Sequence, residues 1–181
     1  ELITVINLDQ VSLRRGSKLL FENVSLQAHA GHRIGLVGAN GSGKSSLFAM
    51  LLGTLDPDEG NLTITSSDRI SHVAQESPSG SRPAIEFVID GDRELRKVQS
   101  AIEKCERQGK SDPLHDLYER LEQLGGFTAE ASAGRLLHGL GFEEPSHWRP
   151  VQEFSGGWRM RLNLAQALMC PSEILLLDEP T

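Results

Sequence analysis

Residues 38–45 read Gly-Ala-Asn-Gly-Ser-Gly-Lys-Ser, and this glycine-rich segment constrains the fold more than any other part of the sequence. Its spacing is G-x-x-x-x-G-K-[ST], which is typical of a loop that wraps a phosphate group between a strand and a helix. Glycines let the backbone approach an anion closely with its amide groups pointing inward. The apolar run 33–37 predicts a short buried strand before the loop. Residues 46–52 predict the helix, which Gly53 ends.

The side chains of this segment suit a nucleoside triphosphate with its magnesium ion. Lys44 supplies a positive charge for the β- and γ-phosphates, and the Ser45 hydroxyl can ligate Mg²⁺. Because the segment opens a helix, the positive end of the helix dipole faces the same phosphates. We count Lys44 among the catalytic residues as well. The predicted nucleotide contacts of this segment are Gly38, Asn40, Gly41, Ser42, Gly43, Lys44, Ser45 and Ser46.

The composition is that of a globular domain with a proper core. A chain of 181 residues is long enough for one α/β domain with a small appended subdomain. The net charge of −7 argues against a surface that binds nucleic acids generally. No apolar run is long enough to span a bilayer. Cys105 and Cys170 lie far apart and lack metal-ligand spacing, which predicts packing thiols in a reducing cytoplasm.

The predicted elements divide the chain into three parts. Residues 1–82 hold strands and the glycine-rich segment, residues 83–153 are helical, and residues 154–181 hold a helix and a last strand. The predicted strands are 2–13, 19–28, 62–64 and 70–74, and the predicted helices outside the hairpin described next are 129–140 and 156–169. Because the chain ends directly after the last strand, we expect it to be part of a longer polypeptide.

Residues 92–124 predict a helical hairpin. Two apolar stripes recur at helical spacing on either side of a break at 109–113. The stripes consist of Leu95, Val98, Ile102 and Cys105, then Leu114, Leu117, Leu121 and Leu124. Such stripes are typical of antiparallel helices with a coiled-coil-like seam. The hairpin can be a helix pair packed within the domain or a projecting arm, and its mixed charges leave both interpretations open.

Two further features stand at the borders of the helical part. Gln75 follows the strand 70–74, where a neutral amide can ligate Mg²⁺ or position a water. Ser155 can cap the helix that begins at Gly156, and Gly156 and Gly157 leave backbone amides open to a phosphate. Each feature alone is weak evidence for a nucleotide site. Their positions between the glycine-rich segment and the last strand make that interpretation specific.

The last strand carries the predicted acidic residues. The apolar run Ile174–Leu177 predicts a buried strand, which presents Asp178 beside the glycine-rich segment, where a carboxylate holds the Mg²⁺ shell. Glu179 is then placed to orient or polarise an attacking water. The alternative is an acidic strand end that faces solvent and has no function. The other motifs in the same chain make this alternative less favoured.

These four motifs resemble those of the ATP-binding cassette (ABC) superfamily. The resemblance covers the whole chain: Walker A at 38–45, a Q-loop at Gln75, an S-G-G signature at 155–157 and Walker B at 174–179. Further details resemble the ABC-F class, soluble proteins with two cassettes in one polypeptide and no transmembrane domain. These details are Trp158-Arg159-Met160-Arg161 after S-G-G, the short region between Lys44 and Gln75, the hairpin at 92–124, and the segment Leu137-His138-Gly139-Leu140-Gly141-Phe142.

The resemblance implies an α/β P-loop NTPase fold and a mechanism. The cassette would have an N-terminal antiparallel β subdomain, a RecA-like core and a helical subdomain that carries the hairpin. ATP would lie on Gly38–Ser46 with Mg²⁺ held by Ser45, Gln75 and Asp178. The signature residues Ser155, Gly156 and Gly157 would cap the ATP held by a second cassette. Gln75 and Glu179 would promote hydrolysis of the ATP held by this cassette.

The ABC-F class further implies a cytoplasmic protein that acts on the ribosome as a translation factor or in ribosome protection. Its partners would be the second cassette, rRNA and tRNA, with the hairpin as the family's arm. One departure concerns adenine, because many cassettes place an aromatic ring just before the glycine that is Gly16 here. The chain has Arg14 and Arg15 at that turn, so adenine would stack on the Arg15 guanidinium or on no side chain.

Two other ATPase classes are alternatives. The ATPase subunit of a membrane ABC transporter usually has S-G-G-Q and an aromatic residue before the glycine at position 16, and this sequence has neither. A DNA-repair or chromosome-structure ATPase would insert a far longer coiled coil than residues 92–124 allow. The sequence therefore favours an ABC-F cassette.

Overall fold

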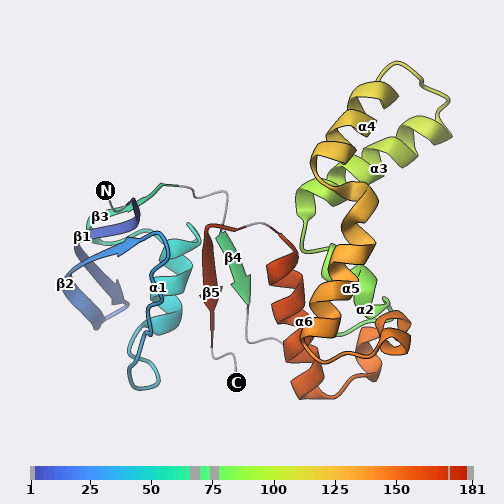
Figure 1. The fold of residues 1–181 in the computed structure, drawn as a ribbon. Helices are drawn as coiled ribbons and strands as arrows, with labels where there is room; N and C mark the ends of the chain where they lie inside the picture. The colour runs from blue at the N-terminus through green and yellow to red at the C-terminus, as the bar shows by residue number, and fades with distance from the viewer. Residues whose placement is uncertain (1–2, 66–69, 74–77, 171, 179–181) are drawn as a thin grey trace. The chain divides into compact units, whose positions relative to one another are not determined.

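The computed structural model describes residues 3–65, 70–73, 78–170 and 172–178, and the chain divides into two compact units (Figure 1). The first unit holds the described residues up to Ile70 together with Ser172–Leu176. The second holds the described residues from Ser71 to Cys170, with residues 177–178. Most strands belong to the first unit and most helices to the second.

An antiparallel sheet forms the body of the first unit. Its strands are β1 (Thr4–Arg15), β2 (Lys18–His29) and β3 (Glu59–Ile64), in the order β2-β1-β3. The tight turn between β1 and β2 contains Gly16 at φ +62°, a left-handed conformation that glycine adopts without strain. Leu8, Val11 and Leu13 are buried in β1, and a shift in the pairing register between Leu8 and Val11 accounts for their odd spacing. These three side chains pack with Met50.

Met50 belongs to helix α1 (Lys44–Leu51), which follows the glycine-rich segment as predicted. A second cluster in this unit joins Leu51 to Ile174 and Leu176. These two residues lie in β5 (Ile174–Leu177), which pairs with β4 (Ile70–Val73) in a two-stranded sheet. The apolar side chains of α1 therefore contribute to two clusters, one with β1 and one with β5.

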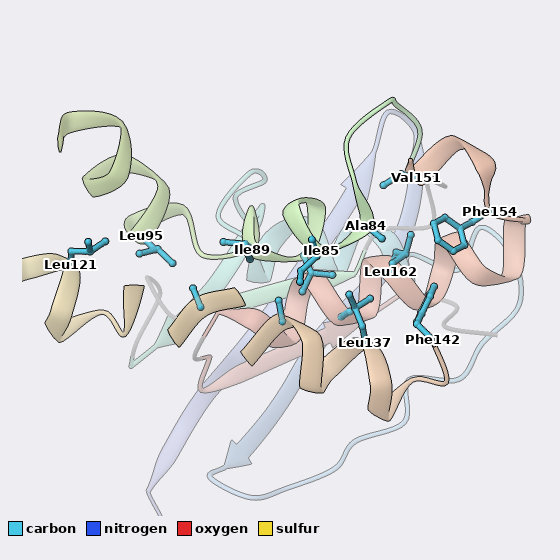
Figure 2. Packing of buried hydrophobic residues seen from close by; sticks show 14 of the residues in the cluster. Ala84, Ile85, Ile89, Leu95, Leu121, Leu137, Phe142, Val151, Phe154 and Leu162 are labelled. Atoms are coloured by element: carbon cyan, nitrogen blue, oxygen red, sulfur yellow. The ribbon is translucent and has the colours of Figure 1, made fainter. Parts of the chain in front are cut away.

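The second unit is helical, with short helices between the long ones. Its elements are α2 (Ala84–Ile89), α3 (Arg93–Arg107), α4 (Leu114–Gln123), η2 (Gly126–Thr128), α5 (Ala129–Gly139), η3 (Glu144–Trp148), η4 (Val151–Glu153) and α6 (Gly156–Met169). Figure 2 shows the buried cluster that holds them together, which runs from Leu95 and Leu121 at one end to Phe142 and Phe154 at the other. Each long helix contributes apolar residues at helical spacing, so one core serves the whole unit.

Helices α3 and α4 form the predicted hairpin, and their ends show that they run antiparallel. Arg120 near the end of α4 pairs with Glu94 at the start of α3 at 3.1 Å, and the Tyr118 hydroxyl donates to Glu106 Oε1 at 2.8 Å. The base is packed, because Leu95 and Leu121 are buried in the cluster of the unit. Within that unit, Figure 1 shows α3 and α4 extending beyond α2, α5 and α6. The hairpin thus combines a packed base with a projecting tip.

Two sequence expectations about strands are wrong. Residues 33–37 form no strand and pair with none of the described strands, and Ile34 and Val37 are 54% and 94% exposed. In β5, Leu175 and Leu177 stay 38% and 37% exposed, so this strand is half-buried. The reason is common to both: an apolar run becomes a fully buried strand only where neighbours cover its edges and faces. Within the part of the chain that the structure describes, β4 and β5 pair with each other and with no further strand.

Among the described residues, the helices are all too short or too polar to cross a membrane.

Candidate functional site

The glycine-rich segment forms a compact turn that leads into α1. Gly43 is the N-cap of the helix at φ +103°, and the Leu47 amide donates to its carbonyl at 2.9 Å. A Cβ atom at Gly43 would lie 3.2 Å from Leu20 Cβ and 3.3 Å from the Phe21 ring. Glycine is therefore required here both by its backbone angle and by the close approach of β2.

Lys44 folds back over the turn that precedes it. Its ammonium donates to Gly38 O at 2.7 Å and to Ala39 O at 3.1 Å, and the Ser42 amide donates to the same Ala39 carbonyl at 3.1 Å. The lysine charge thus lies against the loop and can exchange these carbonyls for phosphate oxygens. Ser45 is exposed on the first turn of α1, whereas Ser46 is only 5% exposed. Ser45 is the better placed hydroxyl for an incoming ligand.

Sequence reasoning missed a second cation at this loop. The Lys18 ammonium, at the start of β2, donates to Gly41 O at 2.9 Å. The sequence contained a signal, since Lys18 closely follows two other basic residues, Arg14 and Arg15, at the end of β1. Arg15, the predicted adenine contact, is exposed at the end of β1. The ammonium groups of Lys18 and Lys44 thus both contact the loop, which suits an anionic ligand.

Asp178, a predicted magnesium ligand, directly follows β5. The Asp178 amide donates to Val73 O at 3.2 Å, which holds the residue at the end of β5, and its side chain is half-buried. Asp178 belongs to the second unit, whereas the glycine-rich segment belongs to the first. Gln75 and Glu179 lie outside the described residues.

Ser155, Gly156 and Gly157 begin α6 and face solvent. Ser155 is the N-cap, but its side chain makes no capping hydrogen bond; its carbonyl accepts from the Arg159 amide at 2.9 Å. A Cβ atom at Gly156 or Gly157 would have no atom within 4 Å. The hydroxyl and the first amides of the helix are therefore open to an approaching anion.

Sequence reasoning also missed an aromatic cluster around these three residues. The rings of Phe154 and Trp158, on either side of Ser155–Gly157, both pack against Phe142. In the sequence, Phe142 and Trp158 stand out only as features that resemble the ABC-F class. No local pattern predicts their contact, because they lie in segments that are distant along the chain.

Comparison with known families identifies the arrangement. The family model described as "ABC transporter" matches residues 21–181, which include the glycine-rich segment, the S-G-G residues and β5. The chain belongs to the ABC family. It has the P-loop NTPase fold of an ABC cassette, with an antiparallel β subdomain and a helical part.

Relatives place this ABC cassette in the ABC-F class. It is 46% identical over 98% of its length to "Probable ATP-binding protein YheS" of Haemophilus influenzae, of which it covers 28%. It is 39% identical over 94% of its length to "Probable ATP-binding protein YbiT" of Escherichia coli O157:H7, of which it covers 33%. To the mouse "ATP-binding cassette sub-family F member 2" it is 36% identical over 98% of its length, covering 28%. The chain thus spans about a third or less of these relatives.

Solved structures agree on the fold of the ABC cassette. A nucleotide-free ATP-binding cassette from an ABC transporter superposes with a TM-score of 0.68 at 20% identity, over 99% of this chain and 70% of that one. CbiO1 of Clostridium perfringens, described as part of the ABC transporter complex cbiONQ, gives 0.67 at 18% identity, over 99% and 66%. At this identity the likeness concerns the fold alone.

The residues of this ABC cassette fit a nucleotide with Mg²⁺. Lys44 and Lys18 supply cations at the loop, and Ser45 presents an exposed hydroxyl. The described residues contain no group of three His, Cys, Asp or Glu side chains that could cage a metal. Magnesium suits such a site, because it is usually held by one or two protein oxygens together with phosphate oxygens and waters.

Proposed function

We propose that this ABC-F cassette binds ATP with Mg²⁺ and hydrolyses it when a second cassette closes over it, and that the protein acts on the ribosome. The proposal rests on two features of this chain, one that can bind the phosphates of ATP and one that can cap the ATP of another cassette. One is a phosphate loop held by Lys44 and Lys18, and the other is an open S-G-G helix start. In this scheme each cassette needs the other's complementary surface.

The phosphate loop performs the binding half of the reaction. The Lys44 ammonium leaves the carbonyls of Gly38 and Ala39 and pairs with the β- and γ-phosphates, while the loop amides and the α1 dipole hold the remaining oxygens. Ser45, Gln75 and Asp178 would hold Mg²⁺, which neutralises charge on the phosphates. Electrostatic positioning of this kind supplies most of the catalysis in phosphoryl transfer.

Glu179 and the second cassette complete the reaction. Glu179 orients or polarises the attacking water. Ser155, Gly156 and Gly157 cap the γ-phosphate of the ATP that the other cassette holds, using the open hydroxyl and amides at the start of α6. Because the cap comes from another cassette, we expect this chain alone to bind ATP weakly and to hydrolyse it negligibly.

The ribosome is the partner that the ABC-F relationship supports. The proposal places the protein in the cytoplasm, as a translation factor or in ribosome protection. Contacts with rRNA and tRNA would involve parts of the protein beyond this chain together with the α3–α4 hairpin. Its tip extends away from the core of its unit, as an arm must.

Sedimentation of ribosomes from a lysate with ATP tests this function. The whole protein is expressed with Glu179→Gln, and with the matching change in a second cassette, so that ATP binds without hydrolysis. We expect ATP-dependent accumulation in the ribosome fraction, and the loss of this accumulation when Lys44→Ala is added. Accumulation with membranes would instead support the transporter ATPase class, and an even distribution with and without ATP would overturn the proposal.

A further inference from the structure

The S-G-G residues lie between two aromatic residues that pack on one ring. Phe142 meets Phe154 with ring centroids 5.5 Å apart and planes at 73°, and it meets Trp158 at 4.7 Å and 68°. Both contacts have the edge-to-face geometry that aromatic pairs favour. Figure 2 shows Phe142 and Phe154 next to each other at one end of the buried cluster. We call Phe142, Phe154 and Trp158 the aromatic clamp.

Two arginines cover the outer rings of the aromatic clamp. The Arg149 guanidinium carbon lies 5.1 Å from the Phe154 ring centroid, and that of Arg161 lies 4.7 Å from the Trp158 centroid. Arg161 Nη1 also donates to Leu140 O at 3.2 Å. The first turns of α6 are thus tied to the segment that follows α5 by stacking and by a hydrogen bond.

Gly141 lets the two segments approach each other. It has φ +91°, and a Cβ atom there would lie 3.4 Å from Arg161 Nη1 and 3.7 Å from the Trp158 ring. The Trp158 side chain is therefore directed toward Gly141 and Phe142. Two sequence features that distinguish this chain from an S-G-G-Q cassette, the Trp158–Arg161 pair and the segment 137–142, form one contact.

The packing of the aromatic clamp limits the backbone flexibility of Ser155–Gly157. Gly156 and Gly157 have a wide choice of backbone angles, and no neighbouring side chain restrains them. A flexible cap would have to be ordered each time a phosphate binds, and that ordering opposes binding. Because Phe154 and Trp158 flank the glycines and share the buried ring of Phe142, they fix both ends of the segment.

We propose that the aromatic clamp holds Ser155–Gly157 in the conformation that caps the γ-phosphate of the opposite cassette. Phe142, Phe154 and Trp158 are then positioning residues, which act through the S-G-G backbone and do not touch the nucleotide themselves. Trp158, the residue after S-G-G, therefore acts within its own cassette, where it supports the backbone of Ser155–Gly157. The inference rests on the proposed function, since it needs a second cassette whose ATP is capped.

Steady-state ATP hydrolysis by the whole protein tests the clamp. Glu179→Gln is present in every variant, so that the hydrolysis measured is that of the ATP which Ser155–Gly157 caps. On this background we expect Trp158→Leu to lower kcat by about tenfold or more, because a small misplacement of a catalytic group slows the reaction strongly. KM for ATP should stay within about twofold, because the phosphate loop is untouched. Trp158→Phe, which keeps a ring, should restore most of kcat. The matched control is Trp148→Leu, since Trp148 lies in the same unit, is 54% exposed and is outside the clamp.

The outcomes separate this inference from the function on which it rests. If the Glu179→Gln protein hydrolyses ATP and Trp158→Leu on this background keeps its kcat, the clamp is overturned while the function stands. If the unmodified protein fails to hydrolyse ATP, both are overturned. Should Trp158→Leu fail to fold, Arg161→Met is the second test, because Arg161 stacks on Trp158 and donates to Leu140 O and so holds Trp158 in the clamp. We expect a lower kcat at an unchanged KM, and an unchanged kcat would overturn the clamp.

Discussion

Truncating Leu137 tests the packing of the helical unit most directly. Its side chain is fully buried (0% exposed) on α5, in the cluster that includes Ala133, Phe142 and Leu162 (Figure 2). Leu→Ala changes at buried sites cost about 2–5 kcal/mol, depending on how far the neighbours can collapse into the space. Here the neighbours come from separate elements, and the Phe142 amide is bonded to the Leu137 carbonyl at 3.0 Å. We therefore expect a loss of about 3–4 kcal/mol.

Urea denaturation followed by the helical circular dichroism signal measures this loss. With a slope of about 2 kcal/mol per molar urea, the midpoint should fall by about 1.5–2 M. The matched control is Leu168→Ala on α6, because the same atoms are removed from a side chain that is 43% exposed. The control should shift the midpoint by less than about 0.3 M. Equal shifts for the two variants would show that Leu137 is not in the core.

Three further predictions concern charges. Lys44→Ala should abolish ATP binding measured by calorimetry, because the cation that pairs with the phosphates is removed; equal affinity would contradict the assigned loop. Lys18→Met should weaken ATP binding by about tenfold, and more at low salt, since an exposed charge is screened by ions; an unchanged affinity at low salt would refute the role of Lys18. The hydrogen bond to Glu106 raises the pKa of Tyr118, the chain's single tyrosine. Ultraviolet absorbance should show that Glu106→Gln lowers this pKa, and no change would refute the contact between α3 and α4. Because the folded pKa is raised, the contribution of this contact to stability should be present below the ordinary pKa of tyrosine and lost as the pH rises through the folded value.

Local pattern was sufficient for most of the elements. The spacing of Leu95, Val98 and Ile102 predicted α3 because a helix brings positions three and four apart onto one face. The glycine-rich segment predicted the start of α1 because only a few backbone conformations lead from such a turn into a helix. The strand at Ile174–Leu177 was likewise found, although its faces differ in burial.

Local pattern was insufficient where neighbours decide the outcome. The segment 33–37 contains Ile34, Leu36 and Val37, which favour a buried strand, yet it lies exposed because no described strand pairs with it. The site shows the same limit, because the bond from Lys18 to Gly41 joins residues from β2 and the phosphate loop. No spacing rule links these two positions.

For this cassette, the sequence was enough to predict which ligands the motif residues can bind, because their types are read directly. It was also enough to predict the helices, whose hydrogen bonds join residues four apart. The tertiary structure alone decided that Phe142 meets both Phe154 and Trp158. Such contacts form between segments far apart in the chain, and they depend on how the whole core packs and not on any local preference.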